Sequence, residues 1–194
     1  IARYVTGRGS QLACNPDGSL LTITHIDASR MVNGDGSAEM PFNVMTASGN
    51  DIVLVQPGAY DLGMTTYDLN VDDQRVLAAA TKAYSTTVKL GGGLTSVQLP
   101  GTGRGGAATV TGMESEVFRV IADRTELSGF TISAPGGQEG IRVSGDNNDS
   151  NCNLVMGGGM MQGIGISDII TTGNLYRDNR VAGKSIGFVF FESM

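Results

Sequence analysis

Few side chains in this sequence are suited to acid–base, nucleophilic or metal chemistry. His25 is the only histidine, so any Ser–His or Cys–His mechanism would have to use this one residue as its base. The same shortage argues against a zinc site, because Cys14 and Cys152 are far apart and lack the spacing of metal ligands. The two cysteines either form a disulfide in an oxidising compartment or remain free thiols, and the sequence leaves both alternatives open.

The densest group of oxygen-bearing side chains is the run Asp146-Asn147-Asn148-Asp149. Asp123 precedes Asp146 and Asp168 follows it at nearly the same interval, so the three could stack on neighbouring coils of a repeating fold. In turns, Asp and Asn side chains commonly bind nearby backbone N–H groups. This structural role is the ordinary interpretation of the run, and a functional role has to be weighed against it.

Basic residues recur in the same part of the chain. Arg119 precedes Arg142 by the same interval that separates Asp123 from Asp146, so the two arginines could lie one above the other. Arg177 and Lys184 follow further on. The simpler interpretation of outward charges on strands is that they keep the surface soluble and prevent unwanted strand pairing.

The composition of the chain argues against some classes of binding partner. The chain has 194 residues and a formal net charge of −6, which argues against non-specific binding to nucleic acid or anionic membranes. No apolar run approaches the length of a transmembrane helix. The 29 glycines beside only 5 prolines indicate frequent turns rather than disorder.

Short runs rich in Val, Ile, Thr and Phe, separated by glycine clusters, predict an all-β protein. Helix signals are nearly absent, and the segment 71–83 fits either a short helix or a strand. Two columns of apolar residues recur along the chain. The first, whose members are evenly spaced, consists of Val88, Val110, Ile132, Leu154 and Tyr176. The second, whose members each have an apolar partner two residues on, consists of Val97, Phe118, Ile141, Ile164 and Ile186.

This repeat predicts a right-handed, single-stranded parallel β-helix with coils of roughly 22 residues, each made of two strands and two turns. Like residues would then stack above like residues and fill the interior. A β-sandwich is the alternative.

Three segments carry a resemblance to a known family. The first two are NGDGSAEMPF at 33–42 and GNDIVLVQPGAY at 49–60, and the third joins LSGFTI at 127–132 to GIRV at 140–143. They resemble the opening segment, the first coil and the recurring coils of pectate-lyase-like β-helix proteins. The resemblance covers about residues 33–191. It implies the fold but not one activity, since the same helix serves lyases, hydrolases, epimerases, adhesins and phage fibres.

The lyases of that family use a Ca²⁺ ion held by carboxylates, and an Arg or Lys as the base that takes a proton beside a uronate carboxylate. For this chain the resemblance implies Arg142 and Lys184 as candidate catalytic bases. It implies as candidate calcium ligands Asp123, Asp146, Asp149 and Asp168. These side chains have to converge in one groove, because calcium needs several oxygen ligands at once. If they lie on different faces, the lyase interpretation is lost.

We divide the chain into an N-terminal segment, residues 1–32, that caps the helix or contacts a partner, and a β-helix, residues 33–194. The run GFVFF at 187–191 predicts an apolar end that another coil, the N-terminal strand or another copy would cover.

The first functional hypothesis is therefore a structural and binding module, extracellular, at the cell surface or on a virion. It would self-associate into a homo-oligomer or a larger assembly, with a polysaccharide as a further partner. The alternatives are a calcium-dependent polysaccharide lyase acting by β-elimination, and a segment of a phage tail fibre or spike, which would demand a trimer.

Overall fold

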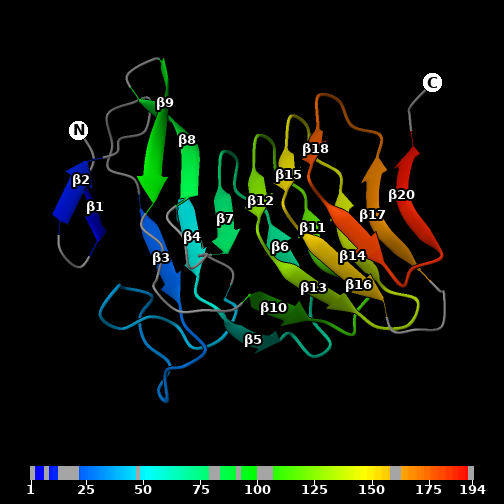
Figure 1. Cartoon of the computed structure of the whole chain (residues 1–194), viewed down its shortest axis with the longest axis horizontal. Helices are drawn as coiled ribbons and strands as arrows, with labels where there is room; N and C mark the ends of the chain where they lie inside the picture. Colours follow the sequence, from blue (N-terminus) through cyan, green and yellow to red (C-terminus); the bar gives the residue numbers. More distant parts are fainter. Residues whose placement is uncertain are drawn as a thin grey trace.

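The computed structural model shows an all-β chain wound into stacked coils (Figure 1). It describes the backbone of residues 3–6, 9–12, 22–46, 49–78, 84–90, 93–99, 107–157 and 163–191, and the side chains of 22–46, 49–78, 107–157 and 163–191. Within these ranges no helix is long and apolar enough to cross a membrane. The strands pair in parallel in three sheets, so the expected parallel β-helix is confirmed and the β-sandwich alternative is wrong.

Each complete coil passes in turn through three parallel sheets. Sheet 1 contains β3 (Ile23–Ile26), β4 (Ile52–Val55), β7 (Arg75–Ala78), β12 (Glu126–Ser128), β15 (Asp149–Asn151) and β18 (Leu175–Arg177). Sheet 2 contains β5 (Gly58–Asp61), β10 (Ala108–Thr111), β13 (Thr131–Ala134), β16 (Leu154–Gly157) and β19 (Arg180–Ala182). Sheet 3 contains β6 (Tyr67–Leu69), β11 (Glu116–Val120), β14 (Glu139–Val143), β17 (Ile164–Ile169) and β20 (Ile186–Phe191).

The sequence predicted two strands in each coil, and the structure has three. The missed strands belong to sheet 1, where β15 consists of the polar run Asp149-Ser150-Asn151. Three residues without an apolar alternation give no periodic signal, so pattern alone could not separate this strand from a turn. The ambiguous segment 71–83 contains the strand β7, and residues 79–83 lie outside the described residues.

The first apolar column is correct for one step and then departs from the true register. Val110 pairs with Ile132, as predicted, but Ile132 pairs with Val155 rather than Leu154. Tyr176 lies in sheet 1, above Ser150. The prediction failed because the turns lengthen toward the C-terminus, so the coil that leads from Val155 to its partner Val181 is longer than the coil between Val110 and Ile132.

The second column departs from the true register later. Phe118 pairs with Ile141, but Ile141 pairs with Ile166, two residues beyond the predicted Ile164. Both columns were also extended too far toward the N-terminus, because Val88 and Val97 belong to an antiparallel hairpin and not to a coil.

The interior of the helix is one continuous apolar core. Aromatic rings pack at an angle to one another at its centre, where the ring centroid of Phe118 lies 5.6 Å from that of Tyr67 and 5.2 Å from that of Phe130. Each fully buried side chain of this size contributes about 1.5–3 kcal/mol to stability. No single coil could bury such residues alone, so the coils stabilise one another.

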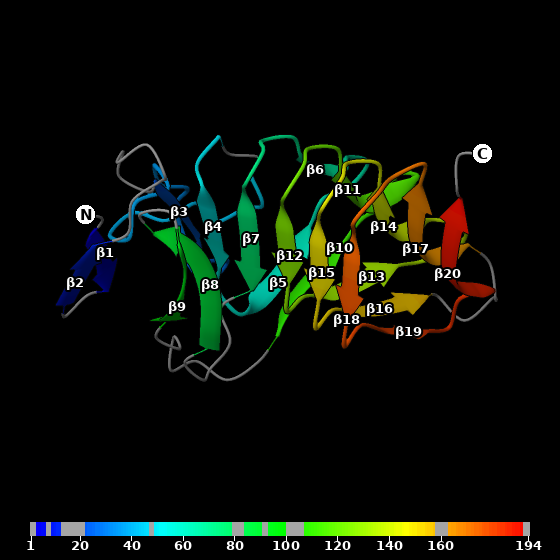
Figure 2. The same ribbon diagram turned by 90° about the horizontal axis from the view of Figure 1, so that it is seen from above.

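Two antiparallel hairpins accompany the helix: β1 (Arg3–Thr6) with β2 (Gly9–Leu12), and β8 (Tyr84–Leu90) with β9 (Gly93–Leu99). The second hairpin is inserted between β7 and β10 and lies beside β3 and β4 in both views (Figures 1 and 2). On sheet 1, Ile52, Leu54 and Leu77 form a second, smaller buried cluster.

The predicted N-terminal segment, residues 1–32, contributes a strand to the helix. Within it, β3 pairs in parallel with β4 as the first strand of sheet 1. Residues 1–2, 7–8 and 13–21, among them Cys14, lie outside the described residues. Cys152 is an exposed free cysteine at the turn between sheets 1 and 2.

Candidate functional site

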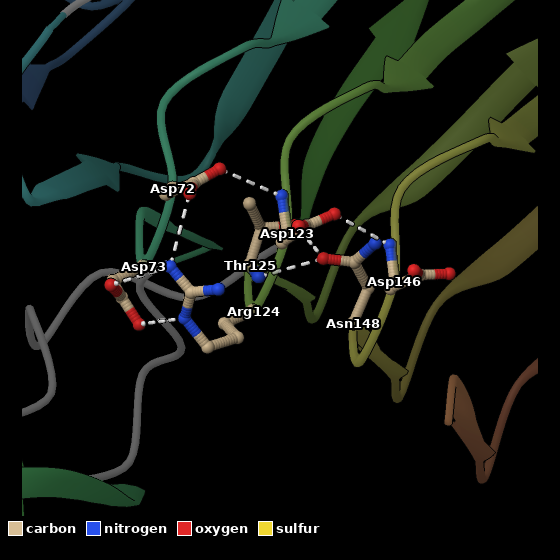
Figure 3. A network of polar contacts seen from close by, with 7 residues as sticks. All are labelled: Asp72, Asp73, Asp123, Arg124, Thr125, Asp146 and Asn148. Carbon is tan, nitrogen blue, oxygen red and sulfur yellow. Dashed lines mark hydrogen bonds and ion pairs between the residues drawn. The ribbon is translucent and has the colours of Figure 1, made fainter. Parts of the chain in front are cut away.

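Two of the acidic residues singled out in the sequence, Asp123 and Asp146, form a ladder with Asp72 at the turns between sheet 3 and sheet 1 (Figure 3). The backbone N–H of Asp123 donates to Asp72 Oδ1 at 3.0 Å, and that of Asp146 donates to Asp123 Oδ1 at 2.8 Å. The backbone N–H of Thr172 donates in turn to Asp146 Oδ1 at 2.7 Å. Each carboxylate therefore binds the backbone of the following coil, and one oxygen of each is used for this purpose.

A parallel ladder of amides lies beside the carboxylates. Asn148 Oδ1 accepts hydrogen bonds from the backbone N–H of Thr125 at 2.7 Å and from its hydroxyl at 2.9 Å. The backbone N–H of Asn148 donates to Asn174 Oδ1 at 2.7 Å. Asn153 and Asn179 form a similar pair at the turns between sheets 1 and 2. The Asp and Asn side chains thus accept hydrogen bonds from backbone N–H groups, as the structural interpretation of the run predicted. The backbone groups that they bind belong to neighbouring coils and not to their own turn.

Arg124 adds an ion-pair clamp at the same turns. Its guanidinium lies 3.0 Å from the carboxylates of both Asp72 and Asp73 (Figure 3). The hydrogen bond to Asp73 is the main cause of the raised pKa of Arg124. All three side chains are well exposed, so the clamp contributes little to stability.

Asp149 and Asp168 lie away from this ladder. Asp149 is on sheet 1, where it forms an ion pair with Arg177. Asp168 is buried on β17 and accepts hydrogen bonds from the hydroxyl of Tyr176 at 2.8 Å and from Asn174 Nδ2 at 3.2 Å. The structure thus joins Asp123 and Asp146 in one ladder, whereas Asp149 pairs with Arg177 and Asp168 contacts Asn174 of the amide ladder.

The residues present do not fit a calcium ion. Among the described residues, no three or more His, Cys, Asp or Glu side chains gather as metal ligands would. The two adjacent carboxylates, those of Asp123 and Asp146, each bind a backbone N–H with one oxygen. Calcium requires six to eight oxygens around one point.

The charged outer surface of sheet 3 contains a second group of side chains. Arg119 and Arg142 are register partners on β11 and β14, as their spacing predicted. Glu116 and Glu139 are partners in the same pair of strands. Two successive coils therefore present the same Glu-x-x-Arg pattern at equivalent positions.

The Arg119 guanidinium is neutralised by carboxylates on both sides. Its Nε and Nη2 donate to the carboxylate of Asp68 at 2.9 and 2.7 Å, and its Nη1 lies 3.5 Å from Glu116 Oε1. The hydrogen bond to Asp68 is the main cause of the raised pKa of Arg119. This bidentate contact, with two parallel N–H···O hydrogen bonds, is the strong form of an arginine–carboxylate ion pair.

Arg142 differs from Arg119 in having no such partner. Its side chain is partly buried, and within the described part of the chain it makes no ion pair and no side-chain hydrogen bond. Glu139, the equivalent of Glu116, accepts a hydrogen bond at 2.7 Å from the hydroxyl of Ser167. Ser167 is 1% exposed and is the register partner of Arg142 on β17.

Lys184, the other candidate base, is bound to the backbone. Its Nζ donates to the carbonyl oxygens of Ala134 and Gln138 at 2.5 and 2.6 Å. Burial lowers its pKa, and the nearby carboxylate of Glu139 opposes that shift. An ammonium held by two carbonyls fastens the turn between sheets 2 and 3.

The lone histidine takes no part in either group. His25 lies on β3 in sheet 1, at the register position of Leu54. Burial lowers its pKa, so the imidazole is neutral at physiological pH. Its position on sheet 1 separates it from the charged surface of sheet 3.

Sequence reasoning missed Asp68, Glu139 and Ser167. The Glu-x-x-Arg pattern, repeated one coil later, could have drawn attention to Glu139. No signal in the sequence places Ser167 beside Glu139, because the coil between Ile141 and its partner Ile166 is two residues longer than the preceding one.

The apolar end expected at residues 187–191 is present on β20. This strand carries exposed side chains on both of its faces, namely Ile186, Phe188, Phe190 and Phe191, which are 40–58% exposed. The Phe190 ring contacts that of Tyr176, with 5.5 Å between the ring centroids.

No protein-family model matches the chain, and no curated protein matches it by sequence. Among solved structures it is similar to a rhamnogalacturonan lyase, with a TM-score of 0.50 and 12% sequence identity. The match covers 87% of this chain and 56% of the other chain, so this chain spans little more than half the length of that lyase. The resemblance to pectate-lyase-like proteins is confirmed at the level of the fold.

Proposed function

We propose that the chain is a binding module that holds an anionic polysaccharide against the outer surface of sheet 3. The observation that carries this proposal is the guanidinium of Arg142, which has no counter-ion among the described residues, one coil away from Arg119, which has two. A guanidinium without a counter-ion can bind a ligand, and a carboxylate or sulfate of that ligand would supply the missing charge. Arginine binds such groups through two parallel hydrogen bonds.

A polysaccharide suits this surface better than a small anion. The surface is a sheet face on which arginines occupy equivalent positions in two successive coils, about 4.8 Å apart. A polymer could lie across several coils and contact Arg142 with one charged group. Carbohydrates of this kind occur outside cells and on particle surfaces, and this location is part of the proposal.

The test is titration calorimetry with polygalacturonate, and with a neutral galactan as the comparison ligand. Arg142→Ala should weaken binding of polygalacturonate at least about tenfold, since one charge-assisted hydrogen bond contributes about 1.5 kcal/mol or more. Arg180→Ala is the matched control, because Arg180 is an exposed arginine on β19 of sheet 2. Equal affinity of wild type and Arg142→Ala would contradict the proposal.

A polysaccharide lyase that works without this calcium site is the second candidate function, favoured by the similarity of fold to a rhamnogalacturonan lyase. That similarity concerns the fold alone, and among the described residues the carboxylates that a calcium ion would need do not gather. Incubation with polygalacturonate, followed by ultraviolet absorption of an unsaturated product, decides the matter. A product that forms in wild type and is lost in Arg142→Ala would establish the lyase.

Self-association is a separate part of the proposal and rests on the exposed phenylalanines of β20. Two copies facing each other would each offer three strand edges, those of β18, β19 and β20, and the same apolar side chains. Light scattering over a dilution series would show a dimer or larger assembly, and Phe190→Asp should disperse it. A monomer at all concentrations would contradict this part and leave the binding proposal standing.

A further inference from the structure

We propose that Ser167 is a positioning residue that keeps Arg142 available by binding the carboxylate of Glu139. This inference rests on the proposed function, in which Arg142 is the anchor for an anionic ligand. It assigns to Ser167 the absence of a Glu139–Arg142 ion pair, although the preceding coil forms the equivalent pair between Glu116 and Arg119.

Both coils have the geometry in which Glu and Arg can pair. On β11, Val117 and Phe118 are consecutive and both fully buried, so Glu116 and Arg119 reach the same outer surface from either side of them. Their observed separation of 3.5 Å shows that the contact forms.

The next coil repeats this local arrangement. A Cβ atom at Gly140 would lie 2.3 Å from Val155 Cγ1 in the core, and the following residue, Ile141, is fully buried. Glu139 and Arg142 therefore flank two inward positions, as Glu116 and Arg119 do. The backbone permits an ion pair in both coils, but among the described residues the pair is present in only one of them.

The two arginines differ in the strand before them, where Arg119 has Asp68 and Arg142 has Arg119, but the two glutamates differ in the strand that follows each coil. For Glu139, the following strand β17 presents the hydroxyl of Ser167, which donates to Glu139 Oε2 at 2.7 Å. For Glu116, the following strand β14 presents Arg142 at the equivalent register position, and Glu116 binds Arg119 and Ser115 instead. A buried hydroxyl at position 167 thus holds the carboxylate that would otherwise reach Arg142.

Lys184 supports the same arrangement from the other side. Its ammonium is bound to the carbonyl of Gln138, the residue before Glu139, and the Glu139 carboxylate lies near enough to raise the pKa of Lys184. The carboxylate therefore has a positive neighbour other than Arg142.

The test compares the accessibility of Arg142 in three forms of the full chain. Phenylglyoxal modifies guanidinium groups that are free, and mass spectrometry of the Arg142 peptide gives the rate. In Ser167→Ala, Glu139 loses its hydroxyl donor and pairs with Arg142, so the rate of modification should fall at least threefold. In the double variant Ser167→Ala with Glu139→Gln, no carboxylate remains to pair, and the rate should return to the wild-type value.

The double variant separates positioning from a general loss of structure. A rate that is unchanged in Ser167→Ala overturns the inference. So does a rate that falls in Ser167→Ala and stays low in the double variant, because that pattern indicates a structural defect. Circular dichroism and thermal unfolding of each variant check that the helix is intact.

Polygalacturonate titrations of the same proteins then judge the proposed function separately. Affinity should fall at least threefold in Ser167→Ala and recover in the double variant. If the modification rates behave as expected while Arg142→Ala binds polygalacturonate like wild type, the proposed function fails and the role of Ser167 toward Arg142 stands. If Arg142→Ala loses binding while Ser167→Ala reacts like wild type, the function stands and this inference fails.

Discussion

The turns between sheets 3 and 1 and the outer surface of sheet 3 are both rich in charge, but they use it differently. At the turns, Asp72, Asp123 and Asp146 each accept a backbone N–H of the next coil. On sheet 3, charged side chains pair with one another, and Arg142 has no such partner among the described residues. Asp123 and Asp146, which attract attention in the sequence, thus bind the backbone of neighbouring coils. Of the two arginines that look alike in the sequence, Arg142 is the one without a counter-ion in the part of the chain that the structure describes.

The largest effect should come from the amide ladder at the turns, at its buried member Asn148. Asn148→Ala removes the acceptor of the Thr125 backbone N–H and hydroxyl, both of which are buried, and should lower the free energy of unfolding by about 2–4 kcal/mol. Urea denaturation measures it. The control is Asn147→Gly at the neighbouring exposed position with φ 57°, where glycine fits without strain and the change should stay within about 0.5 kcal/mol.

The second prediction contrasts the two arginines of sheet 3. Arg119→Ala leaves the buried carboxylate of Glu116 and that of Asp68 without their cation, and should cost about 1–3 kcal/mol. Arg142→Ala removes a charge without a partner and should change the free energy of unfolding by less than about 0.5 kcal/mol. Equal losses in the two variants would show that Arg142 has a structural role after all.

The third prediction concerns the carboxylate ladder itself. Asp123→Ala leaves the backbone N–H of Asp146 without its acceptor and should destabilise the protein by about 1 kcal/mol. Asp123→Asn keeps an oxygen at the same position and should be nearly neutral, because the ladder needs an acceptor and not a charge. A larger loss in the asparagine variant than in the alanine variant would contradict the ladder.

Acid should weaken the ladder at Asp72. The pKa of this carboxyl group is lowered, chiefly by the backbone N–H of Asp123 and also by Arg124. A group whose pKa is lower in the folded state stabilises the protein above its unfolded pKa and loses that contribution as pH falls through its folded pKa. We expect the Tm to decline below about pH 4, and to decline less in Asp72→Asn. Parallel melting curves in wild type and variant at each pH measure the difference.

The smallest expected effect is that of calcium. Because the candidate ligands Asp123, Asp146, Asp149 and Asp168 do not converge, adding millimolar Ca²⁺ should leave the Tm unchanged. A ligand that binds only the folded protein would raise the Tm with its concentration. A calcium-dependent rise that disappears in Asp146→Asn would restore the metal site implied by the family resemblance.

Much of the fold was predictable because the core follows a simple rule. Residues such as Phe118 and Ile141 recur at a nearly constant spacing, so the sequence indicates which strands stack. Register was lost where turn length changed, between Ile141 and Ile166, since a longer turn leaves no mark in the strand itself. The polar strands of sheet 1 were missed because Asp149-Ser150-Asn151 resembles a turn.

The candidate site was predictable only in part. Spacing placed Arg119 beside Arg142 and Asp123 beside Asp146, and both neighbourhoods are observed. The spacing of these residues in the sequence could not show which of the charged side chains would find a counter-ion or a hydrogen-bond partner. That outcome depends on single contacts such as the Ser167 hydroxyl with Glu139, which require the true register and the direction of each side chain.

The ladders at the turns have a mechanical consequence. They run parallel to the axis of the helix, as do the hydrogen bonds between strands, so a pull along the axis is resisted at the corners as well as by the three sheets. Each hydrogen bond joins only two successive coils. If the contacts between one pair of coils break, those between the neighbouring pairs therefore remain intact. Such a rod would yield one coil at a time under tension, which is the behaviour of a stiff spacer with graded extensibility.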